Sequence, residues 1–559
     1  MHRVFILLGL AAAAFACSDD GSEPDGTSSG PGGSGAGNTG GSGGSGGVPS
    51  CPTNATPSET IAITDRGAVE GAVEEDVVVF RGIPYAAPPT GDLRFRPPEL
   101  PACFDGVRDA SAYGSVCPQL APNGSFVGDE DCLTLNVFRP RTEAAPRAVL
   151  FFVHGGGNIS GSASNTVVPG VVTYDGSKLA EEHDVVVVTI QYRLGALGFL
   201  NQAALDSESA DGVSGNYGTL DQVAALEWVK RNIASFGGDP GRVLLFGESA
   251  GAVNTCTLLT SPLASGLFHA ALMQSGSCRQ PAAEVSRVWM DEKVADSSCG
   301  GDADPAACLR GLSAQQIITE LPGALGVFDV SFSPDGRYGP VVDGVVLPKS
   351  PETALADGTF EHVPFVVGAN AEELAALITT TVDSDAEYVA AVEAAMAPFG
   401  AQATEDALAL YPSSAYPSPQ DALVALISDQ RFLCPSRRIA RVASGHGSPV
   451  YRYFFRRRAD APMGPKPAQH CIELLYVFGA LEEIPGFNPA DADVDLATDM
   501  RGYWTSLAIG GAPQAEGAPA WPAYDPQLDN TIVFDSPIGV ENGIRTAECD
   551  FWESLIPPG

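Results

Sequence analysis

The chain has 559 residues, of which 31 are Lys or Arg and 68 are Asp or Glu, so its formal net charge is −37. A polyanion without a basic stripe does not hold nucleic acid through the phosphates, which excludes nucleic-acid binding as a function. Hydrophobic residues make up 44% and charged residues 18% of the chain, a globular composition that excludes global disorder.

The N-terminus has the features of an export signal. Arg3 precedes an apolar run over residues 4–16, which is too short to span a bilayer and therefore predicts a signal peptide over residues 1–16. Residues 14–17 resemble a bacterial lipoprotein box, in which Cys17 becomes the lipidated first residue; simple secretion is the alternative. Either route leads to an oxidising compartment in which disulfides persist.

Residues 17–50 predict a flexible tether. Residues 18–50 contain 13 glycines, many of them in Gly-Gly-Ser units, and offer no apolar surface that folding could bury. The tether would hold a folded domain away from a membrane. The remaining residues, 51–559, have a globular composition without a second low-complexity break or a repeat, which predicts a single domain.

Short apolar runs alternate with longer helical patterns throughout this domain. A helix is predicted over residues 219–235, with apolar side chains at Leu220, Val223, Leu226 and Ile233. Near-continuous apolar strands that alternate with helices are typical of a mostly parallel sheet covered on both faces, a doubly wound α/β architecture. The predicted strands cover residues 77–81, 148–154, 185–192, 243–247, 270–275 and 363–368.

The strongest local motif directly follows the predicted strand at residues 243–247. It reads Gly247, Glu248, Ser249, Ala250 and Gly251, which is a G-x-S-x-G sequence, and a helix is predicted to begin near Ala250. The glycines permit a tight strand-to-helix turn that lifts the serine hydroxyl above the carboxyl edge of the sheet. The motif therefore predicts Ser249 as a nucleophile.

A second motif, His154 followed by three glycines, comes at the end of the buried strand at residues 148–154. An H-G-G-G sequence in this context matches the oxyanion loop of esterases and lipases. Acyl transfer places negative charge on the former carbonyl oxygen, and preorganised backbone N–H groups stabilise that charge. The expected donors are the N–H groups of Gly156, Gly157 and Ala250.

A nucleophilic serine needs a base, and the seven histidines allow elimination. Five of them are set aside. His2 leaves with the signal peptide, and His154 belongs to the oxyanion loop. His183 lies among charged residues, and His269 and His362 precede strands at the opposite sheet edge. His446 and His470 remain, and both satisfy the order Ser, acid, His of this kind of fold.

Several further blocks occur in one order along the chain. They are GIPYA at 82–86, LRF at 93–95, EDCLTLNV at 130–137, YRLGALGF at 192–199, NYG at 216–218, LDQ at 220–222, FGGDP at 236–240 and FGESAG at 246–251. With these blocks, residues 61–557 resemble the type-B carboxylesterase family, which includes cholinesterases, bacterial para-nitrobenzyl esterases and fungal lipases. The resemblance implies the α/β-hydrolase fold.

The resemblance also implies which residues complete the site. The family's G-x-N-x-D-E-G segment corresponds to residues 368–374, which makes Glu373 the catalytic acid and Glu372 the fallback, with Leu374 in place of the usual glycine. The family's H-G-x-E-L-x-Y-V-F-G pattern is matched at residues 470–479, which favours His470 as the base, with Cys471 in place of the glycine.

Two further positions follow from the same resemblance. Glu248 matches an acidic residue of the family beside the nucleophile and would shape the electric field around the imidazolium. Asn158 stands where an aromatic residue is usual, which predicts a more polar wall on the acyl side. Asn158 and residues 321–332 are the expected pocket contacts.

Without Cys17, 11 cysteines remain, so at least one is expected outside a disulfide. The resemblance implies the pairs Cys117–Cys132, Cys299–Cys308 and Cys434–Cys549. A Cys51–Cys103 pair would pin the end of the tether, and a Cys278–Cys471 pair, which would leave Cys256 over, would lock the histidine loop. No metal site is expected, because no C-x-x-C pairs with a histidine cluster.

These residues together predict a serine carboxylester hydrolase that needs no cofactor and acts on small to medium carboxylic esters through an acyl-enzyme. The partners expected are a small-molecule ester and, through the lipid anchor alone, a membrane. A catalytically silent cell-surface binding module is the alternative from another class, although Ser249 and His470 are both present. A cholinesterase is disfavoured because residues 117–132 contain no tryptophan for a quaternary ammonium group, and no lipase lid is evident.

Overall fold

The structure is a computed structural model that describes residues 50–142, 146–323, 337–459 and 466–556. The expected signal peptide, Cys17, and the tether up to residue 49 lie outside the described residues, as do residues 324–332 of the expected pocket segment. Within the described ranges, no helix has both the length and the apolar character needed to cross a membrane.

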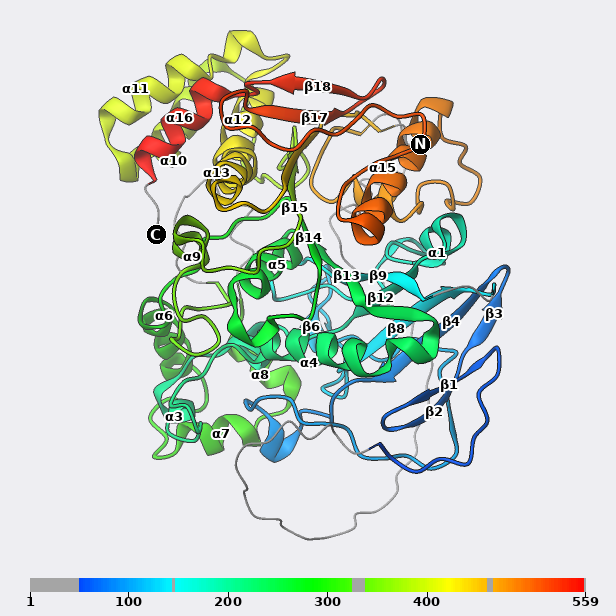
Figure 1. Cartoon of the computed structure of the whole chain (residues 1–559). Coiled ribbons are helices and arrows are strands. Elements are labelled where there is room, and N and C mark those ends of the chain that lie inside the picture. The colour runs from blue at the N-terminus through cyan, green and yellow to red at the C-terminus, as the bar shows by residue number, and fades with distance from the viewer. Residues whose placement is uncertain (1–49, 143–145, 324–336, 460–465, 557–559) are drawn as a thin grey trace, which may run out of the picture.

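One large mixed sheet organises the molecule (Figure 1). Its eleven strands lie in the order β18-β17-β16-β15-β14-β13-β9-β12-β8-β4-β3, and the seven from β17 to β12 are parallel to one another. The strands are β3 Ala72–Glu74, β4 Val77–Pro84, β8 Thr134–Pro140, β9 Arg147–Val153, β12 Val186–Ile190, β13 Gly238–Glu248, β14 Ala270–Gln274, β15 Phe365–Asn370, β16 Val450–Phe455, β17 Asn530–Phe534 and β18 Gly539–Asn542.

The parallel strands are buried on both faces, because successive side chains of a strand point to opposite sides of the sheet. In β13, Val243 and Leu245 enter one hydrophobic core, whereas Leu244 and Phe246 enter a second core on the other face. This explains why these strands are almost continuously apolar in sequence. The mostly parallel sheet with a core on each face confirms the predicted α/β-hydrolase architecture.

Helices cover both faces of the sheet (Figure 1). One face carries α4, α5 and α13, and the other carries α1, α14 and α15. The α-helices are α1 Ser177–His183, α2 Gly195–Phe199, α3 Ala203–Asp206, α4 Tyr217–Asn232, α5 Ala250–Thr260, α6 Ala283–Asp296, α7 Pro305–Gly311, α8 Ala314–Glu320, α9 Pro351–Asp357, α10 Asp385–Met396, α11 Ala401–Leu410, α12 Pro419–Ser428, α13 Cys434–Ala443, α14 Leu474–Val477, α15 Asp491–Gly510 and α16 Thr546–Leu555.

A third core lies under the helices α10, α11, α12 and α16, which gather at one end of the molecule (Figure 1). It contains Leu374, Phe432 and Trp552, all of them buried. Phe432 lies in a π-helical turn over Asp429–Leu433 that joins α12 to α13. Leu374, the residue in place of the family's glycine, is therefore a packing residue of this core.

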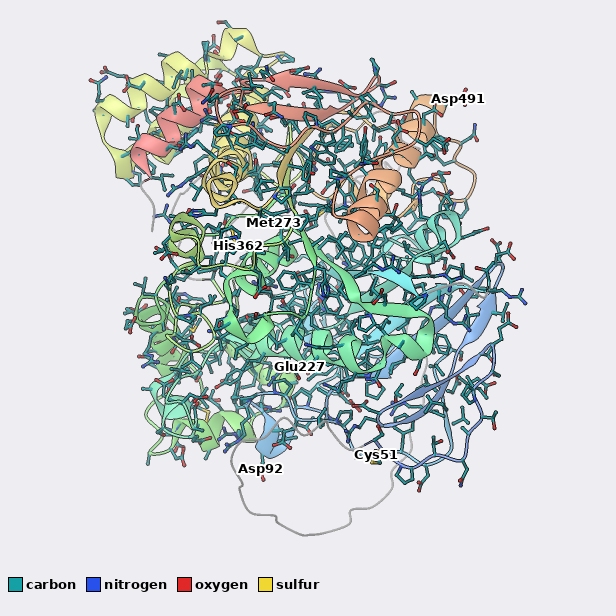
Figure 2. The ribbon with its side chains drawn as sticks, viewed as in Figure 1. Cys51, Asp92, Glu227, Met273, His362 and Asp491 are labelled. Carbon is teal, nitrogen blue, oxygen red and sulfur yellow. A yellow bond between two sulfur atoms is a disulfide. The ribbon has the colours of Figure 1, made fainter. Side chains whose placement is uncertain are left out.

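Small sheets surround the main one. Their strands are β1 Ile61–Thr64, β2 Gly67–Glu70 and β5 Val107–Asp109 in one sheet, β6 Gln119–Leu120 and β7 Phe126–Val127 in another, and β10 Thr166–Val168 and β11 Val171–Val172 in a third. Cys51 lies at the lower edge of the view in Figure 2, on the side of the β1–β2 hairpin.

The six predicted strands are all present, as β4, β9, β12, β13, β14 and β15. Their bounds differ by a few residues from the prediction, most at β13, which begins at Gly238 because Gly238 pairs with Arg147 across a register shift. The helix predicted over residues 219–235 is α4 followed by a 3-10 turn over Ile233–Phe236, and the helix predicted near Ala250 is α5.

Five disulfides join the described cysteines: Cys51–Cys103, Cys117–Cys132, Cys256–Cys278, Cys299–Cys308 and Cys434–Cys549. The three pairs that the resemblance implied are confirmed, and so is Cys51–Cys103. A chain with this many disulfides belongs to an oxidising, extracytoplasmic compartment.

The expected Cys278–Cys471 pair is wrong, because Cys278 is bonded to Cys256. The segment after β14 passes directly over α5: a Cβ on Gly276 would lie 2.5 Å from the Cβ of Ala252. Cys256 stands one helical turn beyond Ala252, so Cys278 meets it on this path. Cys471 stands outside the five disulfides.

Candidate active site

The predicted site residues gather at the carboxyl edge of the parallel strands. β9 ends at Val153 before the glycine loop, β13 ends at Glu248 before Ser249, and β15 ends at Asn370. The three strands end level with each other because Val153 pairs with Gly247 and because β14 links β13 to β15 in register. Ligands of open α/β sheets bind at this edge.

Ser249 occupies a strained turn between β13 and α5. Its φ of 57° and ψ of −121° lie outside the regions that L-residues favour, and its backbone directly precedes the first residue of α5. The turn is tight enough to require both glycines of the motif. A Cβ on Gly247 would lie 2.5 Å from the carbonyl carbon of Gly251, and a Cβ on Gly251 would lie 2.0 Å from the carbonyl oxygen of Val153.

His470 lies next to Glu373. Its Nδ1 is 2.6 Å from Oε2 of Glu373, and its backbone N–H donates to the carbonyl oxygen of Glu373 at 2.9 Å. The imidazole is 7% exposed and its ring centroid lies 4.9 Å from that of Phe432. A proton on Nδ1 is therefore fixed by the carboxylate, which leaves Nε2 to face the serine turn.

The carboxylate of Glu373 is fully buried and held from two sides. Oε2 faces His470, and Oε1 accepts the backbone N–H of Asn370 at 2.7 Å. The fallback residue, Glu372, points elsewhere: it is paired with Arg458, and its Oε2 accepts the backbone N–H of Ala468 at 3.0 Å. The structure thus brings Glu373, and not Glu372, to His470.

Glu248 faces the other nitrogen of the imidazole. Its Oε1 lies 3.2 Å from Nε2 of His470, and its side chain is fully buried. Because Glu248 directly precedes Ser249, this contact locates Nε2 at the serine turn. Two carboxylates thus flank one imidazole, one at each ring nitrogen.

A second layer of polar groups, which the sequence analysis did not assign, lies behind Glu373. Asn370 Nδ2 donates to Oε2 of Glu473 at 2.5 Å, and Gln274 Nε2 donates to Oε1 of Glu473 at 3.1 Å. Burial, together with the nearby carboxylate of Glu373, raises the pKa of Glu473 to about 7. The available signal was the position of Glu473 inside the histidine pattern, three residues after His470.

The glycine loop adopts conformations that only glycine takes without strain. Gly156 has a φ of 104° and Gly157 a φ of 64°, and a Cβ on Gly156 would lie 2.1 Å from the carbonyl oxygen of Ser160. A Cβ on Gly155 would lie 3.0 Å from the Cβ of Ser249. The loop therefore runs against the serine turn.

Asn158 joins this loop to the helix after the serine. Its Oδ1 accepts from Nδ2 of Asn254 on α5 at 2.9 Å and from the hydroxyl of Tyr192 at 3.3 Å. Asn158 is 5% exposed, so its amide is engaged inside the protein. The side chain positions the loop.

The other described histidines are held elsewhere. His154 is buried with Nδ1 2.8 Å from the carbonyl oxygen of Gly155, and burial lowers its pKa to about 4. His446 Nε2 lies 3.1 Å from the carbonyl oxygen of Ala356, and Nε2 of His362, which is labelled in Figure 2, lies 3.0 Å from that of Gly358. Of the two candidates that the sequence left open, only His470 is at the site.

Among the described residues, one group could supply three ligands to a metal ion. It consists of Glu248, His470 and Cys471, whose donor atoms lie within 4.8 Å of one another. Both Glu248 and His470 belong to the constellation just described.

Comparisons with known proteins point to one family. The model of the carboxylesterase family matches residues 58–552. The para-nitrobenzyl esterase of Bacillus subtilis (strain 168) is 35% identical over 501 residues, which cover 86% of this chain and 96% of that protein. The fumonisin B1 esterase of Sphingopyxis macrogoltabida is 37% identical over 495 residues, which cover 86% of this chain and 87% of that protein.

A solved structure titled PNB esterase superposes with a TM-score of 0.75 at 33% identity, covering 89% of this chain and all of that one. Sequence family, relatives and fold therefore lead to one assignment. The chain belongs to the carboxylesterase family and is a serine hydrolase of carboxylic esters.

Proposed function

We propose that Ser249, His470 and Glu373 form the catalytic triad of this esterase. The observation that carries the proposal is the position of one imidazole, with Nδ1 2.6 Å from Glu373 and Nε2 at the turn that presents Ser249. Glu373 fixes the tautomer that leaves Nε2 free of a proton and stabilises the imidazolium that forms during attack.

Catalysis begins when Nε2 of His470 accepts the proton of the Ser249 hydroxyl while Oγ attacks the ester carbonyl. In the free enzyme Nε2 lies 3.2 Å from Oε1 of Glu248, the residue that precedes Ser249. A hydrogen bond between a catalytic base and its nucleophile often aligns only when substrate binds. The alcohol then leaves with the proton from Nε2. Water hydrolyses the acyl-enzyme by the same route.

The developing oxyanion is held by the backbone N–H groups of Gly156, Gly157 and Ala250. Ala250 is the first residue of α5, so its N–H is one of the donors that a helix leaves without an intrahelical partner. The positive end of the helix dipole adds to the stabilisation of the negative charge.

The proposed substrates are small to medium carboxylic esters, and p-nitrobenzyl esters are a suitable first set because a relative carries that substrate in its name. p-Nitrophenyl esters of graded acyl length, with acetylthiocholine and a triglyceride beside them, would define the acyl preference. Asn158 is proposed to act through the oxyanion loop, because its amide is held by Asn254 and Tyr192.

A matched pair of substitutions tests the triad. The carboxylate of Glu373 accepts from the backbone N–H of Asn370 with one oxygen and from Nδ1 of His470 with the other. In Glu373→Gln, one of these oxygens becomes an NH₂ group. If the amide oxygen stays with Asn370, the NH₂ group faces Nδ1 of His470 and favours the wrong imidazole tautomer. We expect kcat to fall by about 10⁴-fold. Glu372→Gln, which changes the neighbouring carboxylate at the surface, should stay within about threefold of the parent; equal losses in the two variants would contradict the assignment.

A fluorophosphonate probe tests the nucleophile independently. It should label the parent at Ser249 and leave Ser249→Ala unlabelled. Absence of label in the folded parent would favour a silent binding module of the same fold.

We also propose that residues 1–16 are a signal peptide, that Cys17 carries a lipid and that residues 17–50 tether a single catalytic domain at 51–559 to a membrane. The extracytoplasmic location indicated by the five disulfides supports this. Metabolic labelling with a palmitate analogue in a bacterial host should mark the parent and not Cys17→Ser. Labelling of neither protein would favour simple secretion, and equal labelling of both would place the lipid at another residue.

A further inference from the structure

Three side chains of different chemistry meet at the serine turn: the carboxylate of Glu248, the imidazole of His470 and the thiol of Cys471. One donor atom from each lies within 4.8 Å of the others. A carboxylate, an imidazole and a thiolate are all ligands that Zn²⁺ takes, and three protein ligands with an open fourth position describe many zinc sites. We propose that these residues form an inhibitory site for Zn²⁺.

The hydrogen bond between Glu373 and His470 prepares the imidazole as a ligand. Histidines that bind zinc usually donate their other ring N–H to a carboxylate, which fixes the tautomer and raises the basicity of the ligating nitrogen. Here Nδ1 lies 2.6 Å from Oε2 of Glu373, so the lone pair of Nε2 faces Glu248. The arrangement that makes His470 a base also makes it a zinc ligand.

The distances require one small movement. Zn–N and Zn–O bonds of about 2.0–2.2 Å and a Zn–S bond of about 2.3 Å place tetrahedral ligands roughly 3.3–3.6 Å apart. Nε2 of His470 and Oε1 of Glu248 are already 3.2 Å apart. The sulfur of Cys471, within 4.8 Å of both, has to approach by at most about 1.2 Å.

The backbone and the charges support the same conclusion. Cys471 has a φ of 65°, a left-handed conformation that favours glycine, and in the family pattern glycine is the usual residue there. A thiol is nevertheless placed at this point, half-buried and outside the five disulfides. Two buried carboxylates, those of Glu248 and Glu373, flank the imidazole and favour a cation.

The inference rests on the proposed function, because inhibition follows from capture of the catalytic base. Binding converts the thiol to a thiolate and releases its proton to solvent, so affinity rises with pH. With Nε2 bound to Zn²⁺, His470 cannot accept the proton of Ser249. A thiolate in the ligand set favours Zn²⁺ and Cd²⁺ over the hard cation Mg²⁺.

Sequence reasoning excluded a metal site because it looked for paired cysteines at short spacing. This cluster combines Glu248 from the end of β13 with two residues that follow β16, so only the fold brings its members together. The cluster depends on two features: the cysteine at position 471, where the family pattern has glycine, and the contact between His470 and Glu248.

Binding is tested without reference to activity. Full-length Ser249→Ala protein is titrated with Co²⁺ as a spectroscopic substitute for Zn²⁺, and Ser249→Ala/Cys471→Ser is the matched control. We expect a thiolate-to-cobalt charge-transfer band in the first protein, absent from the second and bleached by Zn²⁺. A band of equal intensity in both proteins, or no band in either, would overturn the site.

Inhibition is tested in the active enzyme, with each variant compared with its own metal-free rate. Parent activity should fall with added Zn²⁺, recover with a chelator and not respond to Mg²⁺. Cys471→Ser and Cys471→Gly should need at least about tenfold more Zn²⁺ for half inhibition, the least expected from loss of a ligand. An unchanged Zn²⁺ response in both variants would refute the proposal, whereas loss of the triad assignment would appear as fluorophosphonate labelling outside Ser249.

Discussion

Replacement of Gly251 by alanine is expected to impair catalysis through the backbone of the proposed oxyanion loop. The added Cβ would lie 2.0 Å from the carbonyl oxygen of Val153, and real Cβ atoms essentially never approach closer than 3.0 Å. Helix α5 and the end of β9 must therefore separate by at least 1.0 Å. Val153 directly precedes His154 and the glycine loop, so we expect the displacement to reach the proposed oxyanion donors, the N–H groups of Gly156 and Gly157.

The size of the effect follows from this distance. Oxyanion donors act at about 2.7–3.1 Å, and a misplacement of about 1 Å can cost on the order of 100-fold in rate. We expect kcat for p-nitrophenyl acetate to fall by about 100-fold in Gly251→Ala, with a smaller change in KM. The overpacking should also lower the free energy of unfolding by about 1–3 kcal/mol.

Gly311→Ala at the end of α7 is the matched control, because a Cβ there meets no atom within 4 Å. Circular dichroism and thermal unfolding establish that each variant is folded before the rates are compared. Should Gly251→Ala fail to fold, Gly155→Ala makes the milder test, since its Cβ would lie 2.8 Å from Oε2 of Glu248. A folded Gly251→Ala enzyme with kcat within threefold of the parent would refute the reasoning.

Three further predictions concern stability. In the folded protein the pKa of Glu473 is raised from its ordinary value of 4.5 to about 7. The protonated side chain therefore stabilises the fold fully below about pH 4.5, and this contribution is lost as the pH rises through 7. The loss approaches about 3 kcal/mol at alkaline pH, and the melting temperature of Glu473→Gln relative to the parent should therefore rise between pH 5 and pH 9; a constant difference would contradict the shift. Removal of the Cys256–Cys278 disulfide, which closes a loop with a sequence separation of 22, should lower the free energy of unfolding by about 3 kcal/mol in urea titrations, and a loss below 1 kcal/mol would show that the bond adds little. Asp221→Asn leaves Arg193 buried without its carboxylate, to which Nη2 donates at 2.6 Å, and should cost about 3–5 kcal/mol; a thermal unfolding curve that matches the parent would disprove this.

Much of the fold could be predicted because the parallel strands are buried on both faces. Such strands appear in the sequence as unbroken apolar runs, and β9 and β13 are the clearest examples. The serine turn could be located because a tight strand-to-helix connection demands glycine at Gly247 and Gly251. These signals are local, so one sequence suffices to detect them.

The remaining features depend on contacts between distant parts of the chain. The partner of Cys278 is decided by the path of the segment after β14 across α5, and nothing near Cys278 in sequence reports that path. The hydrogen bonds that Asn158 accepts from Asn254 and Tyr192 likewise join distant parts of the chain, and its expected place in a pocket wall stays a prediction. Strands β16, β17 and β18 were not among the predicted strands, although β16 and β17 carry β-branched and aromatic residues.

The third hydrophobic core has a consequence for how the enzyme fails under stress. Leu374, next to the proposed acid, and Phe432, which faces the ring of His470, are both anchored in this core, and the Cys434–Cys549 disulfide fastens it. Partial opening of these helices would misplace acid and base while the sheet stayed intact. Inactivation on heating should then be an early reporter of local melting, several degrees before the bulk of the molecule loses its ellipticity.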